Sequence, residues 1–173
     1  MEEKVLLKAS LVFPVTHTHV LLAKKQKKIG KGCWNGYGGG PEPGDRDILD
    51  TAVRELREES GGMTCQREAL QKVAVVDFHN RKHDGEQFTC RVDVYLLHAW
   101  SGQPTVTPEM TEPTWFAKGD LPLAGLMPAD PDWLPRVLAG ETIYAEAWYG
   151  PEQKTLEQPT QIRSLSPEEL NRL

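Results

Sequence analysis

Three glutamates with helical spacing stand in the segment Arg54-Glu55-Leu56-Arg57-Glu58-Glu59-Ser60-Gly61. Residues three and four positions apart share a helix face, so Glu55, Glu58 and Glu59 would project side by side. Carboxylates this close repel one another unless a cation lies among them, and hard divalent ions such as Mg²⁺ or Mn²⁺ prefer oxygen ligands. The spacing therefore indicates either a metal site or a solvated helix face whose charge the two arginines of the segment neutralise.

The glycine-rich segment before these glutamates favours the metal site. Between Gly30 and Gly44 the sequence holds seven glycines, which allows a loop to bring its backbone close to a ligand. The segment leads directly into the acidic helix, where backbone carbonyls and carboxylates can converge on one ion while amides face phosphate. The composition of this stretch thus predicts a binding loop beside the carboxylates.

Together the loop and the helix resemble the Nudix box, in which Gly, five residues, Glu and seven residues precede Arg-Glu-apolar-x-Glu-Glu-x-Gly-apolar. Gly39, Asp45 and the run that starts at Arg54 follow this pattern, which spans about residues 39–62. Asp45 replaces Glu, eight residues rather than seven precede Arg54, and Gly62 replaces the last apolar residue. We expect the extra residue to fall at the loop-to-helix junction and to leave the acidic helix face undisturbed, so the chain is identified as a member of the Nudix family.

Three further segments resemble the MutT-homologue enzymes of that family, which sanitise nucleotide pools by hydrolysing oxidised purine nucleoside triphosphates. The resemblance covers about residues 5–165. It implies metal-dependent cleavage of a purine (deoxy)nucleoside triphosphate, such as 8-oxo-dGTP, to the monophosphate and pyrophosphate, with Mg²⁺ as cofactor and Mn²⁺ as a substitute. The three segments are Gly32-Cys33-Trp34-Asn35-Gly36-Tyr37-Gly38-Gly39, Glu109-Met110-Thr111-Glu112-Pro113-Thr114-Trp115-Phe116 and Met127-Pro128-Ala129-Asp130-Pro131-Asp132-Trp133-Leu134-Pro135.

The same resemblance implies roles for individual residues. The catalytic groups would be the three helix glutamates, with Glu58 or Glu59 helping to deprotonate the attacking water, and Arg54 would brace the acidic helix. Lys25 would contact phosphate. The metal ligands would be the Gly38 carbonyl and the carboxylates of Glu55, Glu58, Glu59 and Glu109. The substrate-binding residues would be Ser10, Lys25, Asn35, Tyr37, Met127, Asp130 and Trp133.

The base pocket departs from the pattern of those enzymes. They read the base with an adjacent Asp-Asp pair below a stacking Trp, whereas the corresponding positions here hold Met127, Ala129 and Asp130. Alanine supplies no hydrogen bond to a purine edge, and a lost pairing of this kind changes discrimination between bases. The resemblance therefore predicts the reaction, while a preference for oxidised guanine stays open.

Two other functions remain open from the sequence. The same box chemistry would serve a pyrophosphatase that acts on ADP-ribose or a nucleotide sugar. The altered box spacing and Asp45 would also suit a non-catalytic Nudix module that binds a nucleotide or a partner protein. A silent module, however, has no physical need to keep three crowded carboxylates.

Length, charge and cysteine content limit the partners of the protein. The chain of 173 residues suits one domain, 1–173, and a net charge of −5 provides no broad basic surface for nucleic acid. No apolar run approaches the roughly 20 residues that span a bilayer. Cys33, Cys65 and Cys90 have no metal-site spacing, and three cysteines cannot all pair internally. We therefore expect a cytoplasmic protein with reduced thiols that acts as a monomer on a small-molecule nucleotide, without contacts to nucleic acid or membrane.

The elements that must position these residues predict an α/β fold, with a mixed β-sheet sandwiched between helices. The strongest helix spans 47–60, because Leu49, Ala52 and Leu56 form an apolar stripe that ends before Gly61. We expect the first two strands to form a hairpin, and the polar tail from about residue 166 to fray. Strands are predicted at 5–15, 20–23, 73–78, 88–100, 143–149 and 160–164, and a second, short helix at 132–139.

Overall fold

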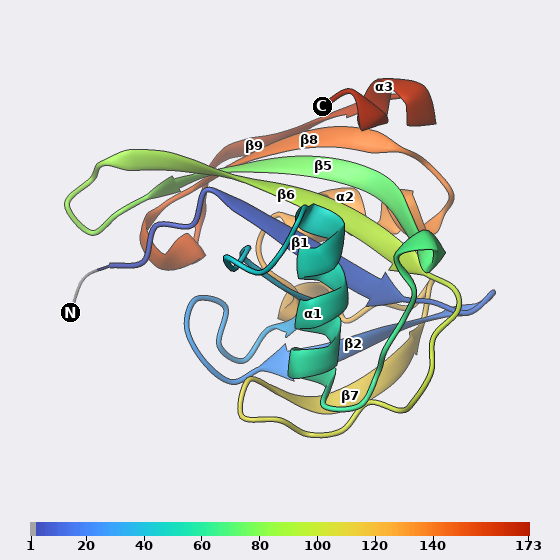
Figure 1. The fold of residues 1–173 in the computed structure, drawn as a ribbon. Helices are drawn as coiled ribbons and strands as arrows, with labels where there is room; N and C mark the ends of the chain where they lie inside the picture. Colours follow the sequence, from blue (N-terminus) through green and yellow to red (C-terminus); the bar gives the residue numbers. More distant parts are fainter. Residues whose placement is uncertain (1–2) are drawn as a thin grey trace.

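Strand pairing within residues 3–173, the part of the chain that this computed structural model describes, divides nine strands into two sheets (Figure 1). Residues 1 and 2 of the predicted domain lie outside the described part. The larger sheet has the strand order β4-β1-β6-β5-β8-β9 and the smaller one the order β3-β2-β7. The strands are β1 (Lys8–Pro14), β2 (His19–Lys25), β3 (Trp34–Asn35), β4 (Tyr37–Gly39), β5 (Leu70–Arg81), β6 (Gln87–Leu97), β7 (Met110–Ala117), β8 (Ile143–Tyr149) and β9 (Leu156–Ser164).

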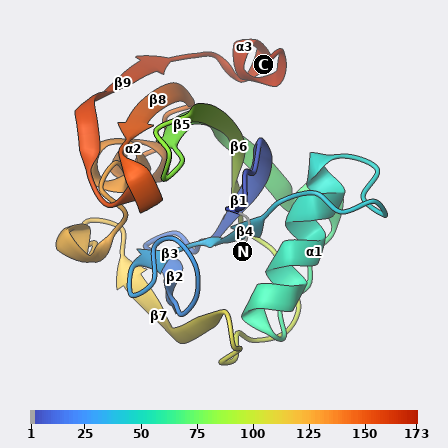
Figure 2. The ribbon, with the colours of Figure 1, turned by 90° about the vertical axis from the view of Figure 1, so that its left-hand side faces the viewer.

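The larger sheet is mixed, and helices cover both of its faces. Strands β1 and β6 run parallel, as do β5 and β8, while the other neighbours are antiparallel. Figure 2 shows α1 and α2 on opposite sides of this sheet. The predicted α/β class is therefore confirmed. The helices are α1 (Ile48–Ser60), α2 (Asp130–Leu138) and α3 (Pro167–Asn171), and single 3₁₀ turns lie at η1 (Arg67–Ala69), η2 (Leu123–Gly125) and η3 (Pro151–Gln153).

Helix α1 has strong signals at both ends. The Asp47 side chain accepts a hydrogen bond from the Asp50 amide at 3.1 Å, and Gly61 ends the helix with a φ of 69°, in the left-handed region that favours glycine. Between these ends, Ala52 and Leu56 are completely buried against the larger sheet. The helix predicted at 47–60 is confirmed, with Asp47 as its N-cap, and α2 begins two residues earlier than predicted.

The predicted hairpin of the first two strands is wrong. Strands β1 and β2 follow one another in the chain but belong to different sheets, and only a bridge between Val15 and Val20 joins them at the turn. Strand β1 lies between β4 and β6 in the larger sheet. Within β1, the adjacent residues Val12 and Phe13 point to opposite faces of the sheet, and both are completely buried. Burial on both faces suits a strand inside a sheet and not one arm of a two-stranded hairpin.

Two other local expectations differ from the structure. The tail does not fray, because Ser166 and Glu169 form a capping box at the start of α3 and Leu170 is completely buried. The glycine-rich segment, predicted as loop, contains the short strands β3 and β4. Here the backbone of β4 pairs with β1, with Gly38 opposite Leu11, and this pairing fixes the segment that leads to α1.

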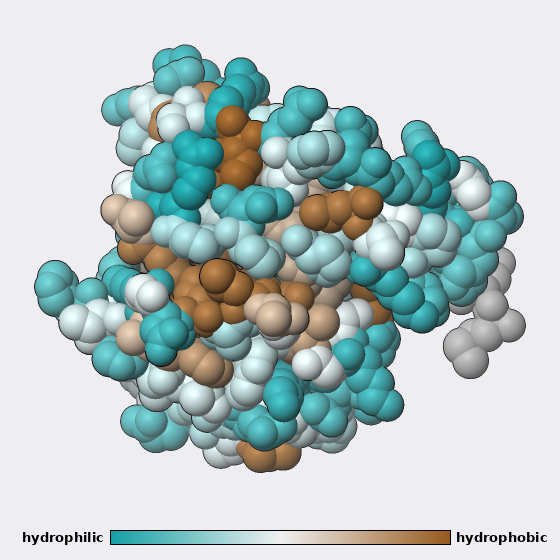
Figure 3. All heavy atoms as spheres, turned by 180° about the vertical axis from the view of Figure 1, so that it is seen from behind, coloured by the Kyte–Doolittle hydropathy of each residue, from teal (hydrophilic) through white to brown (hydrophobic). Residues whose placement is uncertain are grey.

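The rear surface is mostly hydrophilic, with apolar residues gathered near its middle (Figure 3). Large apolar side chains with high exposure include Val106, Leu7 and Leu123. Within residues 3–173, no helix combines the length and the apolar character that a membrane crossing requires.

Candidate functional site

Helix α1 brings its acidic face against the glycines of β4. The Gly38 amide donates a hydrogen bond to Oε1 of Glu59 at 2.8 Å. A Cβ atom at Gly39 would lie 2.5 Å from Oε1 of Glu55, so the Glu55 carboxylate rests directly on the glycine backbone. The prediction that the glycine-rich segment approaches the carboxylates closely is therefore confirmed, and any side chain at Gly39 would displace Glu55.

The loop before β7 brings Glu109 to the end of α1. The Thr107 hydroxyl donates to the carbonyl of Glu59 at 2.9 Å, and the amide of Thr105 donates to the carbonyl of Ser60 at 2.8 Å. On the other side, the amide of Gln26 donates to the carbonyl of Glu109 at 2.9 Å. These bonds tie a segment about fifty residues downstream to the acidic helix.

The charges in this region influence one another. Burial raises the pKa of Glu59 to about 7, and the negative charges of Glu55 and Glu109 act in the same direction. Burial also raises the pKa of Glu55, against the effect of the neighbouring Arg54. Burial lowers the pKa of Lys25, against the attraction of Glu59 and Glu109. The site thus collects carboxylates at a point where little solvent screens them.

Arg54 holds the acidic face together from the side. Its Nη1 donates to Oε1 of Glu55 at 3.0 Å and to Oε2 of Glu58 at 3.1 Å. Its Nη2 donates to Oδ2 of Asp45 at 2.8 Å and to the carbonyl of Gly40 at 2.9 Å. Asp45 therefore forms an ion pair with Arg54, although its side chain is shorter than the Glu of the box pattern. Arg54 braces the acidic helix, as predicted.

The donor atoms of this region fit a hard divalent cation. All of them are oxygens, from four carboxylates and a backbone carbonyl. Burial raises the pKa of Glu59 and the charges of Glu55 and Glu109 add to this effect, and a bound cation would offset both. Among residues 3–173, no three acidic, histidine or cysteine side chains already converge on a single point. The reason is local: Arg54 spans Glu55 and Glu58, while Glu59 turns to the Gly38 amide.

A cavity of about 200 Å³, here called the first cavity, runs from Glu59 to Asp130. Asp130 is only 3% exposed, and burial raises the pKa of its carboxyl to about 7. The Ser10 hydroxyl is buried in the wall and finds no hydrogen-bond partner among the described residues, as expected where a ligand supplies one. Five of the predicted substrate-binding residues line this cavity: Ser10, Lys25, Asn35, Met127 and Asp130.

The other two predicted substrate-binding residues, Tyr37 and Trp133, lie behind the cavity wall. Both side chains are completely buried. Tyr37 packs in the core beneath α1, and Trp133 meets Phe13 edge-on with ring centroids 6.1 Å apart. Trp133 still influences the cavity, because its Nε1 donates to Oδ1 of Asp130 at 3.0 Å. Trp133 thus adjoins the cavity through Asp130, and its own side chain is not part of the cavity lining.

Residues that the sequence did not single out also line the first cavity, among them Phe78, Tyr149 and Gln153. The rings of Phe78 and Tyr149 stack at 5.9 Å, and the Tyr149 hydroxyl accepts a hydrogen bond from the Ala129 amide at 2.8 Å. Nε2 of Gln153 donates to Oδ1 of the buried Asn80 at 2.8 Å. The aromatic residues stand in predicted strands. Gly150-Pro151 marks the turn before Gln153, but nothing in the sequence indicates that this side chain reaches the cavity.

Comparisons with known proteins agree with this geometry. The NUDIX domain family matches residues 6–137. The oxidized purine nucleoside triphosphate hydrolase of Mus musculus is 36% identical over 129 residues, which cover 75% of this chain and 78% of that protein, and that of Danio rerio is 33% identical over the same shares. The crystal structure of a MutT protein from Bacillus halodurans superposes with a TM-score of 0.71, covering 92% of this chain and 97% of that one, and its 24% identity makes this a likeness of fold.

Proposed function

This chain belongs to the NUDIX domain family, and we propose that it hydrolyses oxidised purine nucleoside triphosphates to the monophosphate and pyrophosphate. One observation carries the proposal: a single cavity extends from the acidic end of α1, at Glu59, to the buried Asp130. A nucleotide in this cavity would place its phosphates at the carboxylates and its base at Asp130. The substrate class named for the relatives in mouse and zebrafish supports the same conclusion.

We propose Mg²⁺ as the metal, with Mn²⁺ as a substitute, held by the Gly38 carbonyl and by Glu55, Glu58, Glu59 and Glu109. Such ions lower the pKa of bound water and offset the charge of the phosphates. Arg54 keeps the glutamates of α1 in place, and the bonds of Thr107 keep Glu109 beside them. Either Glu58 or Glu59 accepts the proton of the attacking water.

The remaining polar residues of the cavity would orient the nucleotide. Lys25 lines the first cavity together with Glu59 and Asp130 and would contact phosphate. Oδ1 of Asn35 accepts a hydrogen bond from the Gly36 amide at 2.8 Å, which leaves the Asn35 amide nitrogen free to donate to a base. Asn35 and Asp130 would therefore supply the hydrogen bonds that Ala129 cannot.

The test is a panel of ordinary and oxidised purine nucleoside triphosphates, incubated with and without Mg²⁺, with pyrophosphate as the measured product. We expect metal-dependent release of pyrophosphate, fastest from an oxidised nucleotide. If no triphosphate in the panel yields pyrophosphate, the proposal is wrong. ADP-ribose and a nucleotide sugar belong in the same panel, because their cleavage gives monophosphates without pyrophosphate and would favour the alternative enzyme.

A reducing compartment and a single chain are consistent with this function. Cys33, Cys65 and Cys90 are all free thiols in the structure, as a cytoplasmic protein would have them. The proposed metal and nucleotide sites need no residue from a second copy of the chain. We therefore propose a cytoplasmic enzyme that is active as a monomer.

A further inference from the structure

The loop between β2 and β3, residues 26–33, runs alongside the first cavity. At its start, the Gln26 amide donates a hydrogen bond of 2.9 Å to the carbonyl of Glu109, at the acidic end of the cavity. Further along, a Cβ atom at Gly30 would lie 2.7 Å from the Met127 sulfur, so the loop packs tightly on Met127 at the other end. The residues between these two contacts therefore stand beside the cavity.

The lysines of this loop belong to a segment without acidic residues. Residues 4–41 include seven lysines and no Asp or Glu, although the net charge of the chain is −5. Lys24 pairs with Glu112 at 3.5 Å, and Lys25 lines the first cavity. The other three lysines of the loop region are exposed and form no ion pair with any residue among 3–173. We call them the lysine rim, and they are Lys27, Lys28 and Lys31.

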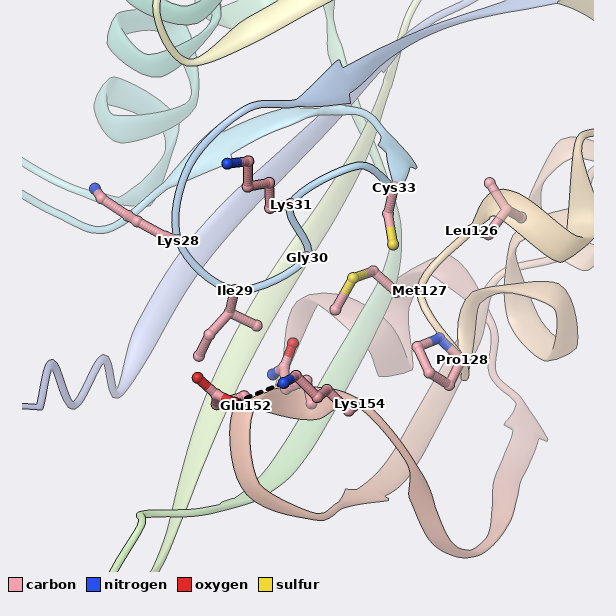
Figure 4. A pocket seen from close by; sticks show the side chains of 11 residues that line it. Lys28, Ile29, Gly30, Lys31, Cys33, Leu126, Met127, Pro128, Glu152 and Lys154 are labelled. Atoms are coloured by element: carbon pink, nitrogen blue, oxygen red, sulfur yellow. Dashed lines mark ion pairs between the residues drawn. The ribbon is translucent and has the colours of Figure 1, made fainter.

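The side chains of the lysine rim reach into solvent and not into a binding pocket. A second cavity, of about 420 Å³, lies beside the first, and Lys28 and Lys31 belong to its wall (Figure 4). Figure 4 shows both side chains directed away from the centre of this cavity. Lys154, in the same wall, pairs with Oε2 of Glu152 at 3.0 Å. Cations that do not converge on one point act on an anion through their electric field and not through fixed hydrogen bonds.

Lys28 occupies a backbone conformation that suits a different residue. Its φ of 64° lies in the left-handed region, which glycine and asparagine adopt more readily than lysine. Backbone strain of this kind is more frequent beside functional sites than elsewhere. Burial lowers the pKa of Lys25 in the wall of the first cavity, and the charge of Lys28 acts in the same direction. The field of Lys28 therefore reaches the first cavity.

We propose that the lysine rim draws the polyphosphate of the substrate to the first cavity and so favours triphosphates over nucleotides of lower charge. This inference rests on the proposed function, in which the phosphates lie near Glu59. The protein and a nucleoside triphosphate are both negatively charged, and the acidic end of the cavity adds to their repulsion. A group of unpaired cations beside the cavity reverses the local field and speeds the encounter. The lysines are thus positioning residues that raise the association rate and leave the chemical step unchanged.

The test is the triple variant Lys27→Gln/Lys28→Gln/Lys31→Gln. We expect its kcat/KM for a purine nucleoside triphosphate to fall about tenfold at low ionic strength, with kcat changed by less than about twofold. The kcat/KM of the wild-type protein should decrease as NaCl is added, and that of the variant should depend less on salt. The inhibition constant of the corresponding monophosphate should rise by less than about threefold, because it carries fewer charges.

Two controls separate the position of the charge from its sign and from the net charge. The variant Lys27→Arg/Lys28→Arg/Lys31→Arg keeps the charges and should keep the wild-type kcat/KM. The variant Lys118→Gln/Arg163→Gln/Arg172→Gln removes three cations that line neither cavity and should lose much less than the rim variant. The inference is overturned if the rim variant keeps the wild-type kcat/KM, if its loss lies in kcat, or if the remote variant loses as much.

Lys28→Asn separates the charge of Lys28 from the shape of the loop. Asparagine tolerates a positive φ, so this variant should raise the midpoint of thermal unfolding and yet lower kcat/KM for the triphosphate. A kcat/KM at or above that of the wild-type protein would contradict the role of Lys28.

If no triphosphate is hydrolysed, the proposed function itself fails, and a non-hydrolysable imidotriphosphate analogue then tests the lysine rim alone. Its association rate constant, measured by stopped-flow fluorescence, should fall about tenfold in the glutamine variant and stay at the wild-type value in the arginine variant. Equal rate constants for the wild-type protein and the glutamine variant, or no binding of the analogue, would overturn the inference.

Discussion

The indole N–H of Trp133 donates a hydrogen bond of 3.0 Å to Oδ1 of Asp130, and this bond joins the hydrophobic core to the wall of the first cavity. Burial raises the pKa of Asp130 to about 7, while the indole bond and the charge of Lys25 act in the opposite direction. With Oδ1 fixed, the other carboxyl oxygen is left for the base. The protonation state of Asp130 then decides whether this oxygen accepts or donates a hydrogen bond.

We expect Asp130→Asn to flatten the dependence of stability on pH. The pKa of Asp130 is raised to about 7 in the folded protein, compared with about 3.9 in an unfolded chain. The folded state therefore binds more protons between these two values, and the free energy of unfolding falls as the pH rises through them. The contribution is fully present below about pH 4 and lost above about pH 7.

Chemical denaturation of wild type and Asp130→Asn at a series of pH values measures this effect. Other titratable groups also face Asp130 and remain in the variant, so the comparison isolates the one carboxyl; they are Lys25, Cys33, Asp132 and Tyr149. Equal slopes for the two proteins between about pH 4 and pH 7 would contradict the raised pKa.

Glu58→Gln should lower turnover at least about tenfold while leaving the fold intact. The Glu58 side chain is 47% exposed, and its contact with Arg54 is a surface ion pair of small energetic value. Its removal therefore costs little stability but deprives the site of one carboxylate. Steady-state kinetics and thermal unfolding measure the two effects separately. Glu68→Gln, an identical change at an exposed glutamate outside the site, should alter neither, and equal turnover in the two variants would remove Glu58 from the mechanism.

Thr107→Val should impair the reaction without touching any group that contacts substrate. The Thr107 hydroxyl bonds the Glu59 carbonyl at 2.9 Å and accepts a hydrogen bond from the Met110 amide at 3.1 Å, and so it fixes the loop that carries Glu109. We expect a loss of about 1 kcal/mol of stability, a several-fold lower kcat and a higher Mg²⁺ requirement. Thr107→Ser keeps the hydroxyl, so its Mg²⁺ requirement should be as low as that of the wild-type protein. If the serine variant needs as much Mg²⁺ as the valine variant, the hydrogen bonds do not position Glu109.

Elements with local sequence signals were predicted correctly. The prediction failed for β1, whose place in the sheet depends on pairing with a strand far away in the sequence. The predicted strand 143–149 matches β8, because its residues alternate between buried and half-buried positions, and helix α1 carries its own cap and apolar stripe. Residues 16–19, between the first two predicted strands, resembled a hairpin turn. Strand β1, however, pairs in parallel with β6, with Lys8 opposite Arg91 at the start of the pairing. Nothing local in a sequence encodes such a partner.

The candidate site shows the same division. The acidic face of α1 follows from helical spacing alone, and its glycine partners follow from the composition of the loop. Tyr37 was assigned to the substrate by its place in a motif, but the alternation of β4 turns its side chain into the core beneath α1. Gln153 was missed because its position depends on a turn in which Glu152 and Gln153 both have positive φ, although neither is glycine.

That turn leads to a last prediction, on the recognition of the base. Gln153 has a φ of 55° and reaches the first cavity, and its bond to Asn80 leaves the side-chain oxygen free to accept a hydrogen bond. Strained backbone of this kind persists where the surroundings hold it, and it is found often at ligand sites. Gln153→Gly relieves the strain, worth about 1 kcal/mol, and loses a hydrogen bond of similar value, so stability should change little.

The base preference of Gln153→Gly, by contrast, should change. We expect the ratio of kcat/KM between guanine and adenine nucleotides to shift by about tenfold, because one acceptor at the base edge is lost. Glu112→Gly is the matched control, since Glu112 also has a positive φ, of 52°, but lines neither cavity. That change should raise the unfolding midpoint slightly and leave the ratio as it is. A ratio that shifts equally in both variants would mean that backbone strain, and not the Gln153 amide, governs the preference.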